Sequence, residues 1–296
     1  MHGVLVIDKP GGVSSTFVVD KVRRALHMVK AGHGGTLDPI ATGVLPICVG
    51  SGTKVAQFLL ADDKAYVAEG LLGVTTDTLD RAGRVLDERP VDPGLTRDDV
   101  LAALARFTGE LDQVPPMYSA IKQGGTRLYH RARAGEDVER PPRRIRIDQL
   151  ELVAFEPPRF RIAVACSKGT YVRSLVADLG DALGVGAHLT ELRRTRSGRF
   201  TLEHAVPLDA IDPAKLIPAV DATNLPKLTV APELVAMIFN GLQLPIEAFG
   251  AEGLERFQLI DAQGRLLAIA HPEAGRTVYD RAFPELIGWD NRRIGT

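Results

Sequence analysis

Short apolar runs alternate with turn-forming residues along the first fifty positions. Residues 4–7 and 44–49 are almost continuously apolar, which is typical of buried strands. Between them, apolar residues recur at helical spacing over 17–26, and either Ser14 or Ser15 can cap the start of a helix. The pattern therefore predicts a strand, a helix and a second strand in this part of the chain.

The middle of the chain carries both strand-like segments and apolar residues at helical spacing. Residues 64–73, 145–155 and 160–166 read as strands, and the last two form a hairpin across 156–159. Thr96 and Asp99 have the spacing of a capping box, which predicts a helix over 100–107. A further helix is expected over 175–183. These elements predict a mixture of helices and strands.

Prolines and small residues between 209 and 226 indicate a linker. Beyond it, apolar runs at 257–260 and 266–270 flank an Asp-x-x-Gly turn, Asp261 to Gly264, which is a hairpin signal. We therefore expect a small β-rich part at the carboxyl end.

Composition narrows the class of protein. The chain has 296 residues, is 45% hydrophobic and carries a formal net charge of −1, so any affinity for nucleic acid must come from local basic clusters. Its two cysteines lie in apolar segments, as thiols do in a reducing cytosol. The first ten residues do not have the pattern of a signal peptide, and no apolar run is long enough for a membrane span. We expect a cytoplasmic protein, a monomer, without a metal.

Residues 32–43 combine four glycines with His33 and Asp38, directly before an apolar run. Glycine lets a backbone approach a ligand closely, and Pro39 keeps Asp38 out of the helical region. The residues alone leave two readings open. Asp-Pro and Gly-Gly are ordinary turn formers, whereas a rigid loop that presents a carboxylate is typical of a catalytic site.

Five ordered motifs between residues 3 and 200 resemble the TruB family of tRNA pseudouridine-55 synthases. Three of them are residues 3–15, 32–45 and 64–83. The fourth is the Pro-Pro-x-Tyr-Ser-Ala-x-Lys segment at 115–122 with Gly-x-Arg-Leu-Tyr after it, and the fifth is residues 169–173. A Leu-x-Arg-x-x-x-Gly pattern that begins at Leu192 follows them. Gly34 departs from the family, which usually has Thr there.

The resemblance implies roles for individual residues. Asp38 would be the catalytic nucleophile, and Arg173 would pair with its carboxylate. His33 would help to stack or displace the target base, Tyr66 would stack on it and could remove a proton, and Leu192 would line its pocket. Lys9 and Pro10 would brace the catalytic loop, although Lys9 could instead contact a phosphate.

Basic residues gather in two places. Residues 113–146 contain prolines and many arginines in an irregular stretch, which fits either a solvated surface insertion or an RNA-binding arm. A second group, Arg193, Arg194, Arg196 and Arg199, could likewise meet phosphates or be solvated. The candidate RNA contacts are Lys122, Arg127, Arg143, Arg144, Arg193 and Arg196.

Taken together, the resemblance implies an α+β fold of the pseudouridine-synthase type, with a mixed, largely antiparallel sheet, flanking helices and a small β-rich C-terminal domain. Residues 1–220 would be the catalytic domain with a thumb-like insertion at about 113–146, and 221–296 a PUA-like domain. The implied reaction is the isomerisation of the T-loop uridine of tRNA after base flipping, with neither cofactor nor metal. Two alternatives are an aspartyl phosphotransferase and a non-catalytic tRNA-folding protein.

Overall fold

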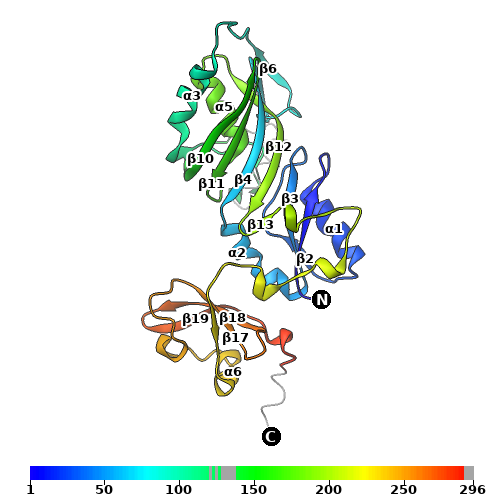
Figure 1. Ribbon diagram of the computed structural model, residues 1–296, viewed down its shortest axis with the longest axis vertical. Helices are drawn as coiled ribbons and strands as arrows, with labels where there is room; N and C mark the ends of the chain where they lie inside the picture. Colours follow the sequence, from blue (N-terminus) through cyan, green and yellow to red (C-terminus); the bar gives the residue numbers. More distant parts are fainter. Residues whose placement is uncertain (120–121, 124–125, 128–137, 290–296) are drawn as a thin grey trace.

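The computed structural model describes residues 1–119, 122–123, 126–127 and 138–289. A large sheet with helices on its flanks occupies one end of an elongated molecule, and a small four-stranded sheet occupies the other (Figure 1). In the described part of the chain, no helix is long and apolar enough to cross a membrane.

The large sheet is mixed and largely antiparallel, as predicted. Its main path is β14 (Val206–Pro207), β1 (Gly3–Lys9), β3 (Thr42–Val49), β12 (Ala187–Ser197), β4 (Lys64–Leu72), β11 (Arg159–Cys166), β10 (Arg143–Glu156) and β7 (Gly109–Gln113). Three short strands pair at its margins, namely β2 (Ala31–His33) with β3, β13 (Phe200–Thr201) with β12 and β15 (Ile217–Pro218) with β1. The pairs β1–β14 and β3–β12 are parallel, and the other pairs are antiparallel.

The β3–β12 pair joins the two halves of this sheet through a short contact at Thr42 and Gly43. Gly43 has φ +99°, and a side chain at this position would collide with the backbone oxygen of Arg194. Only glycine lets the two strands approach so closely. The segment directly before β3 therefore enters the sheet at the seam between its halves.

Helices form where the apolar pattern predicted them, near residues 17–26, 100–107 and 175–183, and the described part of the chain contains two further helices. Together these helices are α1 (Ser15–Ala25), α2 (Ala56–Ala61), α3 (Arg97–Leu104), α5 (Val172–Ala182) and α6 (Pro232–Phe239). Ser14 caps α1 by accepting from the Phe17 amide, and the predicted capping box of Thr96 and Asp99 is present at α3. Short 3₁₀ turns are η1 (Gly50–Val55), η2 (Ala105–Phe107), η3 (Leu202–His204), η4 (Pro213–Lys215), η5 (Ala219–Asp221), η6 (Ile246–Phe249) and η7 (Pro284–Leu286).

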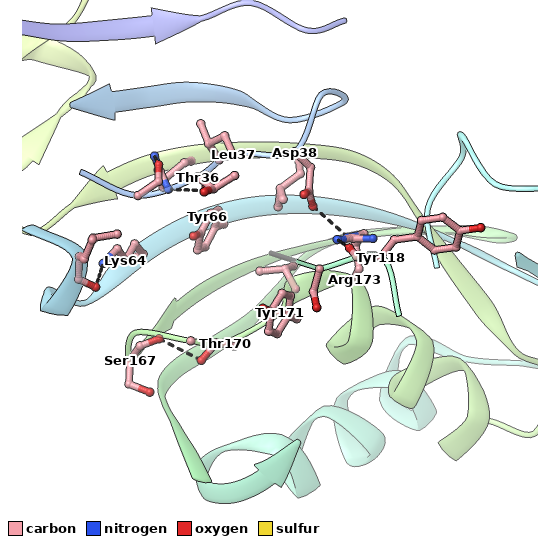
Figure 2. Close-up of a pocket in the computed structure, with 17 residues that line it drawn as sticks. Thr36, Leu37, Asp38, Lys64, Tyr66, Tyr118, Ser167, Thr170, Tyr171 and Arg173 are labelled. Carbon is pink, nitrogen blue, oxygen red and sulfur yellow. Dashed lines mark hydrogen bonds and ion pairs between the residues drawn. The ribbon is translucent and has the colours of Figure 1, made fainter. Parts of the chain in front are cut away.

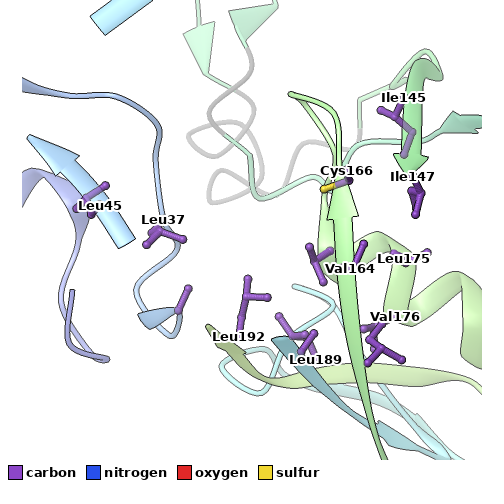
Figure 3. Close-up of a cluster of buried hydrophobic side chains, with 14 of the residues drawn as sticks. Leu37, Leu45, Ile145, Ile147, Val164, Cys166, Leu175, Val176, Leu189 and Leu192 are labelled. Carbon is purple, nitrogen blue, oxygen red and sulfur yellow. The ribbon is translucent and has the colours of Figure 1, made fainter. Parts of the chain in front are cut away.

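One hydrophobic core runs under both halves of the large sheet. Figure 3 shows Leu37, which precedes β3, and Leu192 of β12 in the same cluster as Leu175 and Val176 of α5. Burial of such side chains is the main stabilising contribution to folding. Two ribbons, β5 (Val74–Thr76) with β6 (Val85–Glu88) and β8 (Lys122–Gln123) with β9 (Thr126–Arg127), lie outside the main sheet.

The small sheet has the order β16 (Lys227–Thr229), β17 (Phe257–Ile260), β18 (Leu266–Glu273) and β19 (Arg276–Ala282). The predicted hairpin at Asp261 is confirmed, because β17 and β18 are antiparallel neighbours. This sheet has a core of its own with α6, and Leu266, Ile269 and Phe283 also pack with buried residues of β1 and β3. The carboxyl end is thus β-rich and anchored to the large sheet.

Candidate active site

The loop between β2 and β3 is held by side chains from distant parts of the chain. Lys9 is buried, and its Nζ donates to the carbonyl oxygens of Pro10 at 3.0 Å, Pro39 at 3.2 Å and Ala41 at 2.6 Å. Burial lowers the pKa of Lys9 to about 8, while the nearby Asp38 raises it. The ammonium group thus braces both ends of the turn that carries Asp38.

Two further side chains hold the first half of this loop. Ser15 Oγ donates to the Leu37 carbonyl and accepts from the Leu37 amide, both at 2.8 Å. Arg194 is only 1% exposed, and it donates to the carbonyls of Gly35 at 3.1 Å, Thr36 at 3.3 Å and Val44 at 2.7 Å. These bonds to the backbone of the loop and of Val44 in β3 give the loop a defined shape.

Asp38 lies beside a buried arginine. Its Oδ2 is 2.9 Å from Arg173 Nε, and Arg173 also donates to the carbonyls of Thr78 at 2.9 Å and Tyr118 at 2.8 Å. The Arg173 side chain is 5% exposed and that of Asp38 is 34% exposed. Arg173 is therefore immobilised, whereas the carboxylate remains open to a ligand.

Burial and three neighbouring charged groups act on the pKa of Asp38. Burial raises it, the positive charge of Arg173 lowers it, the second carboxylate at Asp80 raises it again, and the charge of Lys9 lowers it. The net direction is upward from the ordinary value of an aspartate. Arg173 is thus the main group that favours the ionised form of this carboxylate, and Lys9 contributes less.

A pocket of about 420 Å³ opens in front of Asp38 (Figure 2). Tyr66 of β4, Arg173 at the start of α5 and Leu192 of β12 line it together with Asp38, so four separate segments meet there. The other lining residues are Gly35, Thr36, Leu37, Leu60, Lys64, Tyr118, Ser119, Ser167, Gly169, Thr170, Tyr171, Val172 and Arg194. Aromatic, apolar and charged groups in one pocket are typical of a site for a flat polar ligand.

Ionisable groups in the pocket have shifted pKa values. Burial raises the pKa of Tyr66, opposed by the nearby Arg194, so its phenol is protonated at neutral pH. Burial lowers the pKa of Lys64 to about 8, and its Nζ donates to the carbonyls of Leu59 and Leu60. Shifted values in a pocket mark a candidate active site.

Not every residue expected at the site lies in the pocket. His33 is in β2, where its backbone pairs with Ile47, and it is not among the residues that line the pocket. Pro10 is exposed, and its carbonyl accepts one of the Lys9 bonds. The sequence brings Asp38, Tyr66, Arg173 and Leu192 together but leaves His33 at the base of the loop.

The basic group in β12 divides into different environments. Arg193 pairs with Asp8 through contacts of 2.8 and 3.1 Å, and Arg196 donates to the carbonyl of Gly198 at 3.4 Å. The expectation that Arg194 is solvated is wrong, because it is only 1% exposed. Its guanidinium is buried because alternate residues of a strand face opposite sides, which turns Arg194 toward the loop.

The arginine-rich stretch is described only in part. Arg143 and Arg144 begin β10 and are exposed, and Arg144 lies 3.0 Å from Glu110 and 3.6 Å from Asp112. Lys122 and Arg127 lie in β8 and β9, but their side chains are outside the described part of the structure. Within the described residues, no group of three or more His, Cys, Asp or Glu side chains is arranged to hold a metal ion.

Sequence reasoning missed several residues that shape the site. Lys64 starts β4 two positions before Tyr66, and Gln113 of β7 contacts the backbone of Tyr171 across 58 residues. Ser15 was noticed only as a helix cap. Long-range hydrogen bonds leave no local pattern, so only the neighbouring motif at Tyr66 could have pointed to Lys64.

Comparison with known proteins decides the family. A model described as "TruB family pseudouridylate synthase (N terminal domain)" matches residues 23–172, which is half of the chain. The chain belongs to the TruB family. A second model, "tRNA pseudouridylate synthase B C-terminal domain", matches residues 173–230.

Relatives and solved structures agree with this assignment. The tRNA pseudouridine synthase B of Pseudomonas aeruginosa (strain UCBPP-PA14) is 54% identical over 72% of this chain and 69% of the relative. That of Burkholderia pseudomallei (strain 668) is 47% identical over 93% of this chain and 94% of the relative. A chain in a crystal structure of a Cbf5-Nop10-Gar1 complex superposes with a TM-score of 0.73 at 29% identity, covering 95% of this chain and 84% of that one. The protein is therefore a pseudouridine synthase, an isomerase that modifies RNA.

Proposed function

We propose that this TruB-family enzyme converts the uridine at position 55, in the T-loop of tRNA, to pseudouridine, with Asp38 as the nucleophile. The observation that carries the proposal is the pairing of Asp38 with Arg173 at 2.9 Å in a pocket that Tyr66 and Leu192 also line. The relatives from Pseudomonas aeruginosa and Burkholderia pseudomallei are named for activity on tRNA, which supports this class of substrate.

The reaction is an isomerisation in which atoms balance within the nucleotide. The bond between N1 and C1′ breaks, the uracil turns, and a bond between C5 and C1′ forms. The proton on C5 is lost and N1 gains one. Asp38 contributes a transient covalent bond, to the sugar or to the base, which divides one difficult step into easier ones.

The pocket supplies binding and orientation. A base inside a folded RNA loop must leave its stack to reach a carboxylate inside the pocket, so the substrate uridine enters by flipping. Tyr66 offers an aromatic face for stacking and Leu192 an apolar wall. Arg173 favours the ionised form of Asp38 and orients it, and His33, which lies outside the pocket, helps to displace the base from its stack.

RNA affinity comes from surfaces outside the pocket. In this proposal residues 1–220 are the catalytic domain, the insertion at about 113–146 is an RNA-binding arm, and 221–296 are a PUA-like domain. Arg143 and Arg144 contact phosphates, as do Lys122, Arg127, Arg193 and Arg196. The enzyme works on tRNA as a monomer in the cytoplasm.

Incubation of unmodified tRNA with the protein, followed by mapping of pseudouridine, tests the proposal. We expect modification at position 55, and none in a matched tRNA with cytidine there. A product confined to another position would reject the substrate assignment. An Asp38→Asn variant that still turns over would reject the nucleophile.

A further inference from the structure

The side chain of Gln113 is paired with the backbone of Tyr171 at the entrance to α5. Gln113 Nε2 donates to the Tyr171 carbonyl at 3.0 Å, and the Tyr171 amide donates to Gln113 Oε1 at 2.8 Å. Gln113 is only 3% exposed, although it is the last residue of β7 before the arginine-rich stretch. A buried amide that satisfies both groups of one residue fixes the position of that residue.

Tyr171 precedes the first turn of α5, and no side chain caps this helix. The Gln113 pair therefore does the work of a cap, because it fixes the backbone from which the helix starts. Arg173 lies two residues further along, and its guanidinium reaches Asp38. Any shift of the Tyr171 backbone moves the Arg173 side chain relative to Asp38.

Two other contacts join the same pair of segments. Ser174 Oγ donates to the Val114 carbonyl at 3.1 Å, and Arg173 Nη2 donates to the Tyr118 carbonyl at 2.8 Å. Of these contacts, only those of Gln113 combine a donor and an acceptor on one side chain. Gln113 is thus the main side-chain contact between the start of the insertion, at the end of β7, and the start of α5.

We propose that Gln113 is a positioning residue for the isomerisation, which holds Tyr171 so that Arg173 stays on Asp38. This inference rests on the proposed function, because it gives Asp38 the role of nucleophile. Gln113 touches neither the pocket nor the substrate, so it acts through the backbone. It also links the stem of the proposed RNA-binding arm to the catalytic carboxylate.

Gln113→Leu tests this role, since it removes both hydrogen bonds and keeps a buried side chain of similar size. Misplacement of the Arg173–Asp38 pair should lower kcat about 10- to 100-fold, while the dissociation constant for tRNA is unchanged. The acid limb of the pH–kcat profile should move to higher pH, because a displaced Arg173 lowers the pKa of Asp38 less. Gln149→Leu, an exposed glutamine on β10, should behave as wild type.

Gln113→Glu separates positioning from general support of the fold. A protonated Glu can still donate to the Tyr171 carbonyl and accept from its amide, whereas an ionised one can only accept. The kcat of Gln113→Glu relative to wild type should therefore rise as pH falls. The kcat of Gln113→Leu relative to wild type should instead fall as pH falls.

The outcomes distinguish the two hypotheses. The positioning role would be overturned if the kcat of each Gln113 variant relative to wild type did not depend on pH, or if the variants lost only affinity for tRNA. If Gln113→Leu turns over like wild type while Asp38→Asn is inactive, only this inference fails. If Asp38→Asn retains turnover, the proposed function fails with it.

Discussion

Arginines are buried in one region of the molecule and exposed to solvent in another. At the pocket, Arg173 and Arg194 are buried and bonded to backbone carbonyls, and Arg173 also pairs with Asp38. At the start of β10, Arg143 and Arg144 are exposed, and Arg144 pairs with surface carboxylates. Arginine thus has a fixed, buried side chain that holds the backbone in one region and a solvated, charged side chain in the other.

The difference predicts what each region contributes. Breaking a buried pair leaves an uncompensated charge and costs about 3–5 kcal/mol, whereas an exposed pair contributes about 0–1 kcal/mol. Exposed charges are also screened by salt, and buried ones much less. Changes at the pocket should therefore alter the rate of chemistry, and changes on β10 should alter the affinity for RNA and its dependence on salt.

The largest effect is expected at Asp38. Asp38→Asn keeps the shape of the side chain but removes the nucleophilic carboxylate, so turnover should fall by about 10⁴- to 10⁶-fold. Single-turnover measurement of pseudouridine formation checks this, with Asp20→Asn on α1 as a control that should keep full activity. Substantial turnover in Asp38→Asn, free of deamidation, would leave the loop as an ordinary turn.

Removal of the Asp38 partner should have the next largest effect. Arg173→Met removes the charge that lowers the pKa of Asp38, so this pKa should rise further above its ordinary value. Because the nucleophile must be ionised, the rate falls as pH drops through this pKa, and the variant should lose activity at a higher pH than wild type. We expect turnover on the order of 10²-fold lower at neutral pH.

The control for this variant is Arg97→Met, which removes an arginine that donates to the Leu152 carbonyl. It should leave the pH–rate profile unchanged. An Arg173→Met profile that coincides with that of wild type would show that Arg173 does not tune Asp38.

A smaller effect is expected at Tyr66. Phe keeps an aromatic face, so a stacking role predicts that Tyr66→Phe stays active and that Tyr66→Leu loses about 1–3 kcal/mol of transition-state stabilisation. A role in proton transfer predicts that both variants fail. The values of kcat/KM for the two variants decide between these roles, and near wild-type activity in both would remove Tyr66 from the site.

The smallest effect on chemistry is expected at β10. The double variant Arg143→Ala, Arg144→Ala should bind tRNA more weakly, and the log–log slope of affinity against salt should flatten by roughly 0.7 per lost contact. Arg159→Ala, an exposed arginine paired with Glu69, should keep the slope. An unchanged slope in the double variant would indicate that this stretch is a solvated surface without phosphate contacts.

Local patterns predicted much of the fold. The capping residues Ser14 and Thr96 and the hairpin at Asp261 follow from bonds within a few residues, and the structure contains all three. The meeting of Asp38 with Tyr66 and Arg173 came from the family resemblance, because no local rule joins these separate segments, and Arg173 lies over 100 residues from both of the others.

What remained hidden depends on contacts between distant segments. The sequence pattern around Arg194 is that of a basic surface strand, and only its register beside Gly43 turns it inward. Gln113 looked like the start of an irregular insertion, since its partner Tyr171 lies 58 residues away. Such tertiary hydrogen bonds shape the site without marking the sequence.

The central claim is that chemistry resides in the buried pocket and binding on the exposed arginines. The most direct test is the rate of pseudouridine formation at saturating tRNA for Asp38→Asn and for the Arg143→Ala, Arg144→Ala double variant. The account predicts that saturation restores the double variant to the wild-type rate and leaves Asp38→Asn inactive. A double variant that stays slow at saturation, or an Asp38→Asn that turns over, would contradict it.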